Sequence, residues 1–265
     1  MMDRPQAAWR WARRAPVFGA IGFVLLVSSC AALADVISSR PVTADASLFA
    51  LLVHGARSTL VIVVIATSLS LAAGLGLGAV AGFSGGSWDR SIARLIELVA
   101  AFPTVIVVAI VYSAVEQPGL ATVGVAIALV RLSEVARLVR LEVIAWRSSE
   151  QALAARAIGA TMRGMLLWHL GPRLAVVLAQ TAVSSVSAVI VIETLMEFVG
   201  LGTARTAPTW GATLARAVAA GHNGAAVAVL AASVLTVASA QILAEHVRES
   251  FDPHPRRATP CTPRA

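Results

Sequence analysis

Two carboxylates, Glu193 and Glu197, are the residues of this sequence best placed to do chemistry. They lie one helical turn apart at the end of a long apolar stretch. A carboxylate in such surroundings is costly to bury, so it commonly lines a polar pathway or meets a cationic group. We expect the pair to line a pathway or a gate, and structural polar contacts are the open alternative.

Few other side chains could support catalysis. The stretch Gly82-Phe83-Ser84-Gly85 fits the Gly-x-Ser-Gly pattern of intramembrane serine proteases, with His222 as its base. The expected helix order, however, places Ser84 and His222 ~30 Å apart, at opposite membrane faces. Cys30 and Cys261 are too few and too separated for a metal cluster. All 21 basic residues are arginine, whereas a P-loop needs a lysine, so we predict no ATPase site, metal or cofactor on this chain.

The elements that must position these residues are long apolar helices. Hydrophobic residues make up 58% of the 265 residues and charged residues only 13%, which is typical of a membrane protein. Uncharged runs cover residues 15–34, 58–88, 98–115, 174–192 and 217–244, and a sixth apolar segment covers 119–138. Each is close to or above the ~18–20 residues that span a bilayer. We therefore predict an all-α, polytopic integral membrane protein with about six transmembrane helices.

The arginines indicate how the chain is oriented. With the N-terminus inside, sixteen arginines fall on the cytoplasmic side and four outside. The positive-inside rule then places both termini in the cytoplasm. Because the basic residues follow the membrane sides and form no single patch, the net charge of +7 does not indicate a nucleic-acid partner.

Two local patterns predict how the helices are shaped. Gly74, Gly78 and Gly82 recur every four residues, so they share one helix face that lets a neighbouring helix approach closely. That face could serve static packing or a moving interface. In the third expected helix, Phe102-Pro103 removes a backbone hydrogen bond and predicts a kink.

The segment from Val139 to Pro172 is longer than a simple connection requires. Residues 151–158 are rich in good helix formers, and Gly159 interrupts them at a cost of ~1 kcal/mol relative to alanine. Small residues followed by Met and Leu suit insertion into a groove on a partner protein. The alternative is an amphipathic helix lying on the lipid surface.

Residues in this segment resemble the Glu-Ala-Ala motif of importer-type ABC permeases. Leu153-Ala154-Ala155, then Gly159 and the distal Pro172, follow the order of that motif. Leu153 replaces the usual Glu, and Gly171 replaces the usual Leu. The resemblance implies a coupling helix that docks into the ATPase subunit through Leu153, Ala154, Ala155, Ile158, Gly159, Met162 and Pro172.

Further stretches resemble the C-type subunit of dipeptide/oligopeptide/nickel permeases, over about residues 54–253. They include Ala81–Gly86 with Trp88-Asp89, Ala101–Pro103, Ala136–Arg140, and Glu193 followed by Phe198–Gly202 and Pro208–Gly211. Structural roles are implied for Gly82, Pro103, Gly200, Gly202, Pro208, Trp210 and Gly211. The Thr-Asp-x-x-Gly-Arg-Asp stretch usual before the core of this family is not evident around residues 43–52.

The resemblance implies a type I ABC importer permease fold in the inner membrane. Residues 1–53 would form a cytoplasmic N-terminus, a first transmembrane helix and an outer segment. Residues 54–250 would form a five-helix permease core with its coupling loop at 139–173, followed by a Pro/Arg-rich cytoplasmic tail at 251–265.

The implied partners are a second homologous permease, two ATP-binding subunits that hold ATP and Mg, and an extracytoplasmic solute-binding protein. The implied cargo is di- or oligopeptides, with nickel chelates, haem or another small solute as alternatives. A secondary transporter is less expected, because such a protein has no use for a long docking loop and the sequence shows no obvious inverted repeat.

Overall fold

The protein is a bundle of long helices. The computed structural model describes residues 48–116, 118–157, 170–202 and 207–251, and these residues contain no strand. The helices are α3 (Leu48–Ser84), α4 (Gly86–Ala101), α5 (Thr104–Ser113), α6 (Leu120–Arg147), α7 (Glu150–Ala157), α9 (Gly171–Phe198), α10 (Trp210–Ala219) and α11 (Asn223–Phe251). The prediction of an all-helical chain is confirmed for the described residues.

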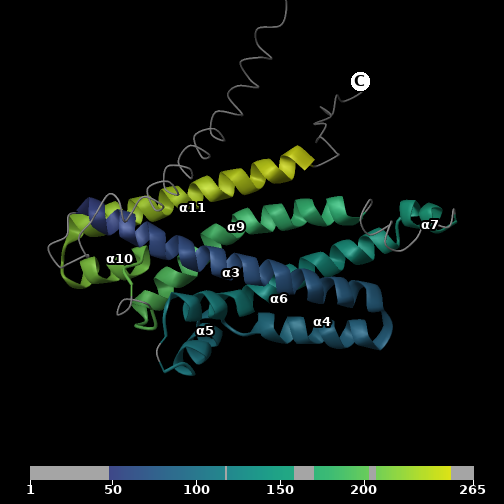
Figure 1. Ribbon diagram of the computed structural model, residues 1–265, viewed down its shortest axis with the longest axis horizontal. Coiled ribbons are helices and arrows are strands. Elements are labelled where there is room, and N and C mark those ends of the chain that lie inside the picture. Colours follow the sequence, from purple (N-terminus) through teal and green to yellow (C-terminus); the bar gives the residue numbers. More distant parts are fainter. Residues whose placement is uncertain (1–47, 117, 158–169, 203–206, 252–265) are drawn as a thin grey trace, which may run out of the picture.

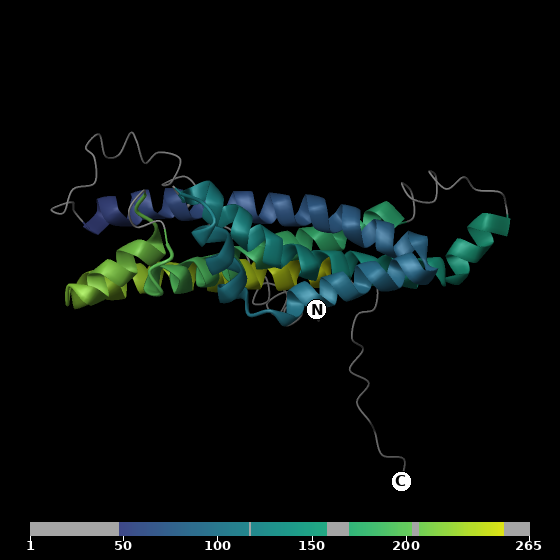
Figure 2. The ribbon, with the colours of Figure 1, turned by 90° about the horizontal axis from the view of Figure 1, so that it is seen from below.

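Four helices, α3, α6, α9 and α11, run side by side along the long axis of the molecule (Figure 1). The short helix α10 lies at one end of this bundle and α7 lies at the other, and the view turned by 90° shows the same separation (Figure 2). We call these the α10 end and the α7 end.

Three of the described helices are long and apolar enough to cross a membrane: α3, α9 and the stretch Asn223–Glu249 of α11. Helices α4 and α5 would form a fourth span if the bent pair crosses as one unit. Helix α6 is 28 residues long and carries several charged residues within an apolar sequence. The first expected span, at residues 15–34, lies outside the described residues.

The kink predicted at Phe102-Pro103 is present, and it is larger than a bend within one helix. Helix α4 ends at Ala101, α5 begins at Thr104, and the two axes differ by 89°. The expected kink is a complete break because Pro103 has no N–H to offer Val99, and because the residue before a proline is driven out of the helical region. Phe102 accordingly adopts an extended conformation, with φ −77° and ψ 137°.

Other helices extend beyond the uncharged runs that predicted them. Helix α3 starts at Leu48, ten residues before its run, and α6 continues to Arg147, nine residues past the end of its segment. The predicted coupling loop at 139–173 therefore begins inside a helix. Helix α10, which sequence analysis did not separate from the last span, is distinct from α11.

Helices α3 and α6 touch along the predicted glycine face. A Cβ built on Gly74 would lie 2.6 Å from the Val135 Cβ atom, and one on Gly78 would lie 2.5 Å from the Ala136 carbonyl oxygen. One on Gly82 would lie 2.6 Å from the Val143 Cβ atom. No side chain fits at these distances, so the close approach of the two backbones requires glycine.

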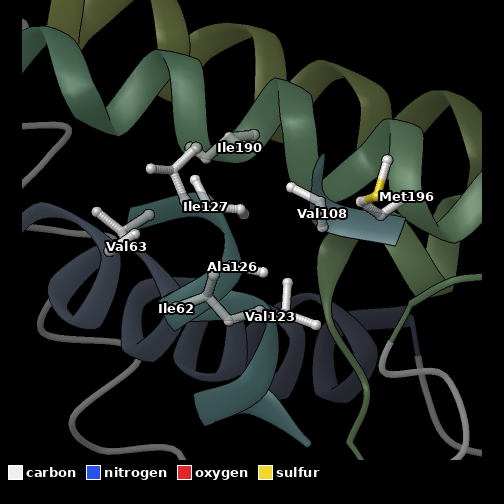
Figure 3. Close-up of a cluster of buried hydrophobic side chains, with 10 residues drawn as sticks. Ile62, Val63, Val108, Val123, Ala126, Ile127, Ile190 and Met196 are labelled. Carbon is white, nitrogen blue, oxygen red and sulfur yellow. The ribbon is translucent and has the colours of Figure 1, made fainter. Parts of the chain in front are cut away.

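The main hydrophobic cluster lies where α3, α5, α6 and α9 meet (Figure 3). Its labelled side chains, which point toward one another, are Ile62, Val63, Val108, Val123, Ala126, Ile127, Ile190 and Met196. A second cluster lies toward the α7 end and includes Trp146, Ala152, Leu170 and Leu174. Ala152 is fully buried there, which joins α7 to the ends of α6 and α9.

Candidate functional site

Glu193 lies inside the protein at the α10 end. Its side chain is only 1% exposed, and its carboxylate faces Thr209 and the backbone of Gly211, at the start of α10. A Cβ on Gly211 would lie 2.9 Å from each carboxylate oxygen and 2.8 Å from the Thr194 Cα atom. Neither oxygen has a hydrogen bond of good geometry to another described residue. The carboxyl group therefore lies beside the N-terminus of α10, where the helix carries partial positive charge.

Glu197, one turn further along α9, is 8% exposed. Its carboxylate packs directly on Gly202, where any added Cβ would overlap it. The Gly202 carbonyl oxygen in turn accepts a hydrogen bond of 2.7 Å from the Tyr112 hydroxyl of α5. Glu197 also lines a cavity of about 390 Å³ between α9 and α10, whose other polar residue is Arg216. The two predicted carboxylates therefore both contact the segment that connects α9 to α10.

Trp210 attaches α10 to α3. Its indole Nε1–H donates to the Leu52 carbonyl oxygen at 2.9 Å, and its backbone N–H donates to the Thr59 hydroxyl at 3.1 Å. Its ring packs on Gly55, where a Cβ would lie 2.7 Å from the Trp210 Cδ1 atom. Thr209 caps α10 by accepting a hydrogen bond from the Ala212 N–H at 3.1 Å. We call Glu193, Thr209, Trp210 and Gly211 the α10 anchor.

The remaining motif residues at this end shape the connection between α9 and α10. Gly200 has φ +81°, a conformation that favours glycine, directly after the end of α9. Pro208 precedes the capping residue Thr209. The structure thus gathers at the α10 end most of the residues that sequence analysis drew from one family motif.

The predicted docking residues that the structure describes lie at the α7 end. Leu153 is 57% exposed on α7 and Ala154 is also exposed, while Pro172 is exposed in the first turn of α9. Ala155 belongs to α7. Ile158, Gly159 and Met162 lie outside the described residues. Helix α7 therefore buries Ala152 against the bundle and leaves Leu153 and Ala154 uncovered.

Two polar contacts near the α7 end were not predicted from the sequence. The Arg140 guanidinium binds both carboxylate oxygens of Asp89, at 2.6 and 2.8 Å, which joins α6 to the start of α4. Arg147 donates to the carbonyl oxygens of Gly82 and Phe83, at 2.6 and 3.0 Å, and so caps the end of α3. Asp89 and Arg140 belong to separate sequence motifs, and only the fold brings them together.

A third polar group lies in the middle of the bundle. Arg131 and Glu134 lie near the end of the apolar segment 119–138, and because α6 continues to Arg147 they are halfway along the helix. Two ionisable residues three positions apart in an apolar helix are a signal that could have identified this group.

The chain matches a family of transport proteins. The family model described as binding-protein-dependent transport system inner membrane component matches residues 74–252. The di/tripeptide transport system permease protein DppC of Pseudomonas aeruginosa is 34% identical over 171 residues, which cover 64% of this chain and 56% of that protein.

Two further relatives have similar identity. The dipeptide transport system permease protein DppC of Alkalihalophilus pseudofirmus is 33% identical over 63% of this chain and 55% of that protein. The glutathione transport system permease protein GsiD of Shigella dysenteriae is 33% identical over 78% of this chain and 68% of that protein. The chain thus spans slightly more than half the length of the two DppC proteins that it matches.

Proposed function

This chain belongs to the family of binding-protein-dependent transport system inner membrane components, and we propose that it is a permease subunit of an ATP-driven importer of di- and oligopeptides. The cargo class is inferred from the relatives, which are named as transport proteins for dipeptides, di/tripeptides and glutathione. The apolar helices α3, α9 and α11 suit a multi-pass subunit of the inner membrane.

The proposed assembly contains a second homologous permease, two ATP-binding subunits and an extracytoplasmic solute-binding protein. In this proposal ATP and Mg act on the ATP-binding subunits, and we expect no cofactor site on this chain. The arginine distribution supports an orientation with both termini and the α7 end in the cytoplasm, and the α10 end outside. ATP binding would bias a rigid-body switch between inward-facing and outward-facing states.

The exposed apolar side of α7 supports its role as the coupling helix. Leu153 and Ala154 are uncovered, while Ala152 on the same short helix is buried against α6 and α9. A partner that binds Leu153 and Ala154 can therefore displace the bundle, because Ala152 on the same helix packs against α6 and α9. Ala155, Ile158, Gly159, Met162 and Pro172 complete the proposed docking surface.

We assign Glu193 and Glu197 to an outer gate. Both are largely buried, so they act by holding α10 and the connection before it, and cargo would not touch Glu193 directly. Gly202, Gly211 and Trp210 provide the close contacts that this arrangement needs.

Uptake by a strain that lacks this subunit tests the cargo class. We expect uptake of labelled di- and tripeptides to fall to background and to return when the chain is supplied on a plasmid. Nickel-chelate and haem uptake, measured in the same strain, should not change. Normal peptide uptake together with loss of nickel or haem uptake would overturn the peptide assignment and keep the transporter class.

Leu153→Arg tests the docking surface. An arginine placed at an apolar contact must lose its hydration, so we expect about tenfold less ATP-binding subunit to co-purify with the permease. Ser148→Arg is the control, because Ser148 is exposed between α6 and α7 and is not one of the predicted docking residues. Equal co-purification for both variants, at equal membrane levels, would contradict docking through Leu153.

A further inference from the structure

A partly buried polar network joins α6 to α9 halfway along both helices. The Arg131 Nη1 atom binds the Glu134 Oε2 atom at 2.7 Å, and the Arg131 Nη2 atom donates to the Ser185 hydroxyl at 2.9 Å. Glu134 is the fifteenth of 28 residues in α6, and Ser185 is the fifteenth of 28 in α9. Each is therefore about 20 Å from either end of its helix. Since α9 is long and apolar enough to span a membrane, this network lies deep within the bilayer.

The two charges are presented unequally at the surface of the chain. The Arg131 side chain is 10% exposed, whereas the Glu134 side chain is 46% exposed. The arginine is therefore recessed between helices, and the surface offers a carboxylate that the arginine holds in place. A carboxylate has about four acceptor sites, so the ion pair with Arg131 leaves it able to bind another donor.

Lipid is an unsuitable neighbour for this face of α6. An exposed carboxylate at mid-membrane depth is costly in hydrocarbon, so such residues commonly face a water-filled space or another protein. Leu129 shows the contrast. It is 45% exposed on α6, and at 100° per residue it lies about 140° around the helix from Glu134. An apolar side chain on that other face suits lipid.

We propose that Glu134, positioned by Arg131, lines the water-filled cargo pathway and binds the protonated amino group of a passing peptide. This inference rests on the proposed peptide-import function. The chemistry is a charge-assisted hydrogen bond between a carboxylate and an ammonium group. The recessed guanidinium keeps the carboxylate oriented and reduces the net charge of the site, so that cargo is held briefly and released. Glu193 cannot take this role, because α10 covers it.

Water access to residue 134 is tested first, in the assembled complex. Cys30 and Cys261 are replaced by serine, and Glu134→Cys or Leu129→Cys is introduced. A membrane-impermeant, negatively charged methanethiosulfonate is then added to both sides of the vesicles. We expect the cysteine at 134 to react at least about tenfold faster than the one at 129. Equally slow reaction at both positions would show that the second permease or lipid covers this face, and would overturn the inference.

The role of the carboxylate is tested by transport in proteoliposomes with saturating peptide-loaded binding protein. We expect Glu134→Gln to slow peptide uptake about tenfold and Glu134→Asp to stay within about threefold of the wild type. Glu142→Gln is the matched control, since Glu142 is also on α6 and faces Arg173 at 3.8 Å. Wild-type uptake by Glu134→Gln would overturn the proposal.

Two readouts separate this inference from the function on which it rests. If Glu134→Gln slows uptake only because the fold is damaged, its thermal unfolding temperature will fall and Glu134→Asp will not restore transport, which would contradict a cargo-binding role. If residue 134 reacts readily but the wild-type complex transports no peptide, the proposed peptide-import function is overturned. The conclusion that residue 134 faces water would still hold.

Discussion

Gly78→Leu will separate α3 from α6 and remove the assembled transporter from the membrane. The atom nearest to a Cβ on Gly78 is the Ala136 carbonyl oxygen at 2.5 Å, and the Val139 Cβ atom follows at 2.7 Å. A backbone oxygen cannot rotate away, so the helix axes must move apart. Overpacking of this kind costs about 1–3 kcal/mol or more. The separation also weakens the contacts of Gly74 and Gly82, on which helix association in lipid depends.

Gly76→Leu provides the control for this prediction. Gly76 lies on the same helix, and a Cβ there would meet no atom within 4 Å. The intrinsic effect of replacing glycine by leucine in a helix is therefore the same, and only the contact differs. Thermal unfolding and size-exclusion chromatography of the purified complex measure the outcome. Similar unfolding temperatures for the two variants would show that the α3–α6 contact is not closely packed.

Trp210→Ala will detach α10 from α3. The indole is 4% exposed, it packs on Gly55, and it donates to the Leu52 carbonyl oxygen. Truncating a buried tryptophan to alanine costs about 3–5 kcal/mol. Helix α10 would then keep its packing on α9 and α11 and the hydrogen bond from the residue 210 N–H to the Thr59 hydroxyl, but it would lose its side-chain contact with the start of α3. We expect a lower unfolding temperature, faster proteolysis within residues 207–222 and loss of peptide uptake.

Trp210→Phe distinguishes packing from hydrogen bonding at the same position. Phenylalanine keeps most of the ring contact with Gly55 and loses only the bond to Leu52, so the cost should be about 1 kcal/mol. The proteolysis rate should stay close to that of the wild type. If alanine and phenylalanine destabilised the complex equally, the hydrogen bond and not the packing would hold α10 in place.

Local sequence patterns predicted the helices well but not where they end. Uncharged runs identified α3, α9 and α11, because a continuous apolar stretch longer than a bilayer has few other solutions. Charge marked the wrong boundary for α6. Its last turns carry Arg140 and Arg147, yet both arginines find tertiary partners in Asp89 and the end of α3. A helix can continue past an uncharged run when the fold provides partners for the charged residues beyond it.

The candidate site was predicted in composition but not in arrangement. The glycine spacing predicted that a neighbouring helix lies close to one face of α3, because helical periodicity is a local property, but it did not identify α6 as that neighbour. The burial of Glu193 depends on α10, which is attached to Thr59 and Leu52, about 150 residues earlier in the chain. No local pattern reports such a distant contact. Likewise, sequence alone could not show that Arg131 is recessed and Glu134 exposed, because that difference arises from the packing of α9 on α6.

Helix α3 is long enough to convert a small rotation at one end into a large displacement at the other. Its first turns hold Trp210, its glycine face is fixed to α6, and its last turn is capped by Arg147. A helix of 37 residues is about 55 Å long. A tilt of about 5° around one end therefore displaces the other end by about 5 Å, the height of one helical turn. A small rotation imposed at α7 can thus become a displacement at α10 that is large enough to open or close a path.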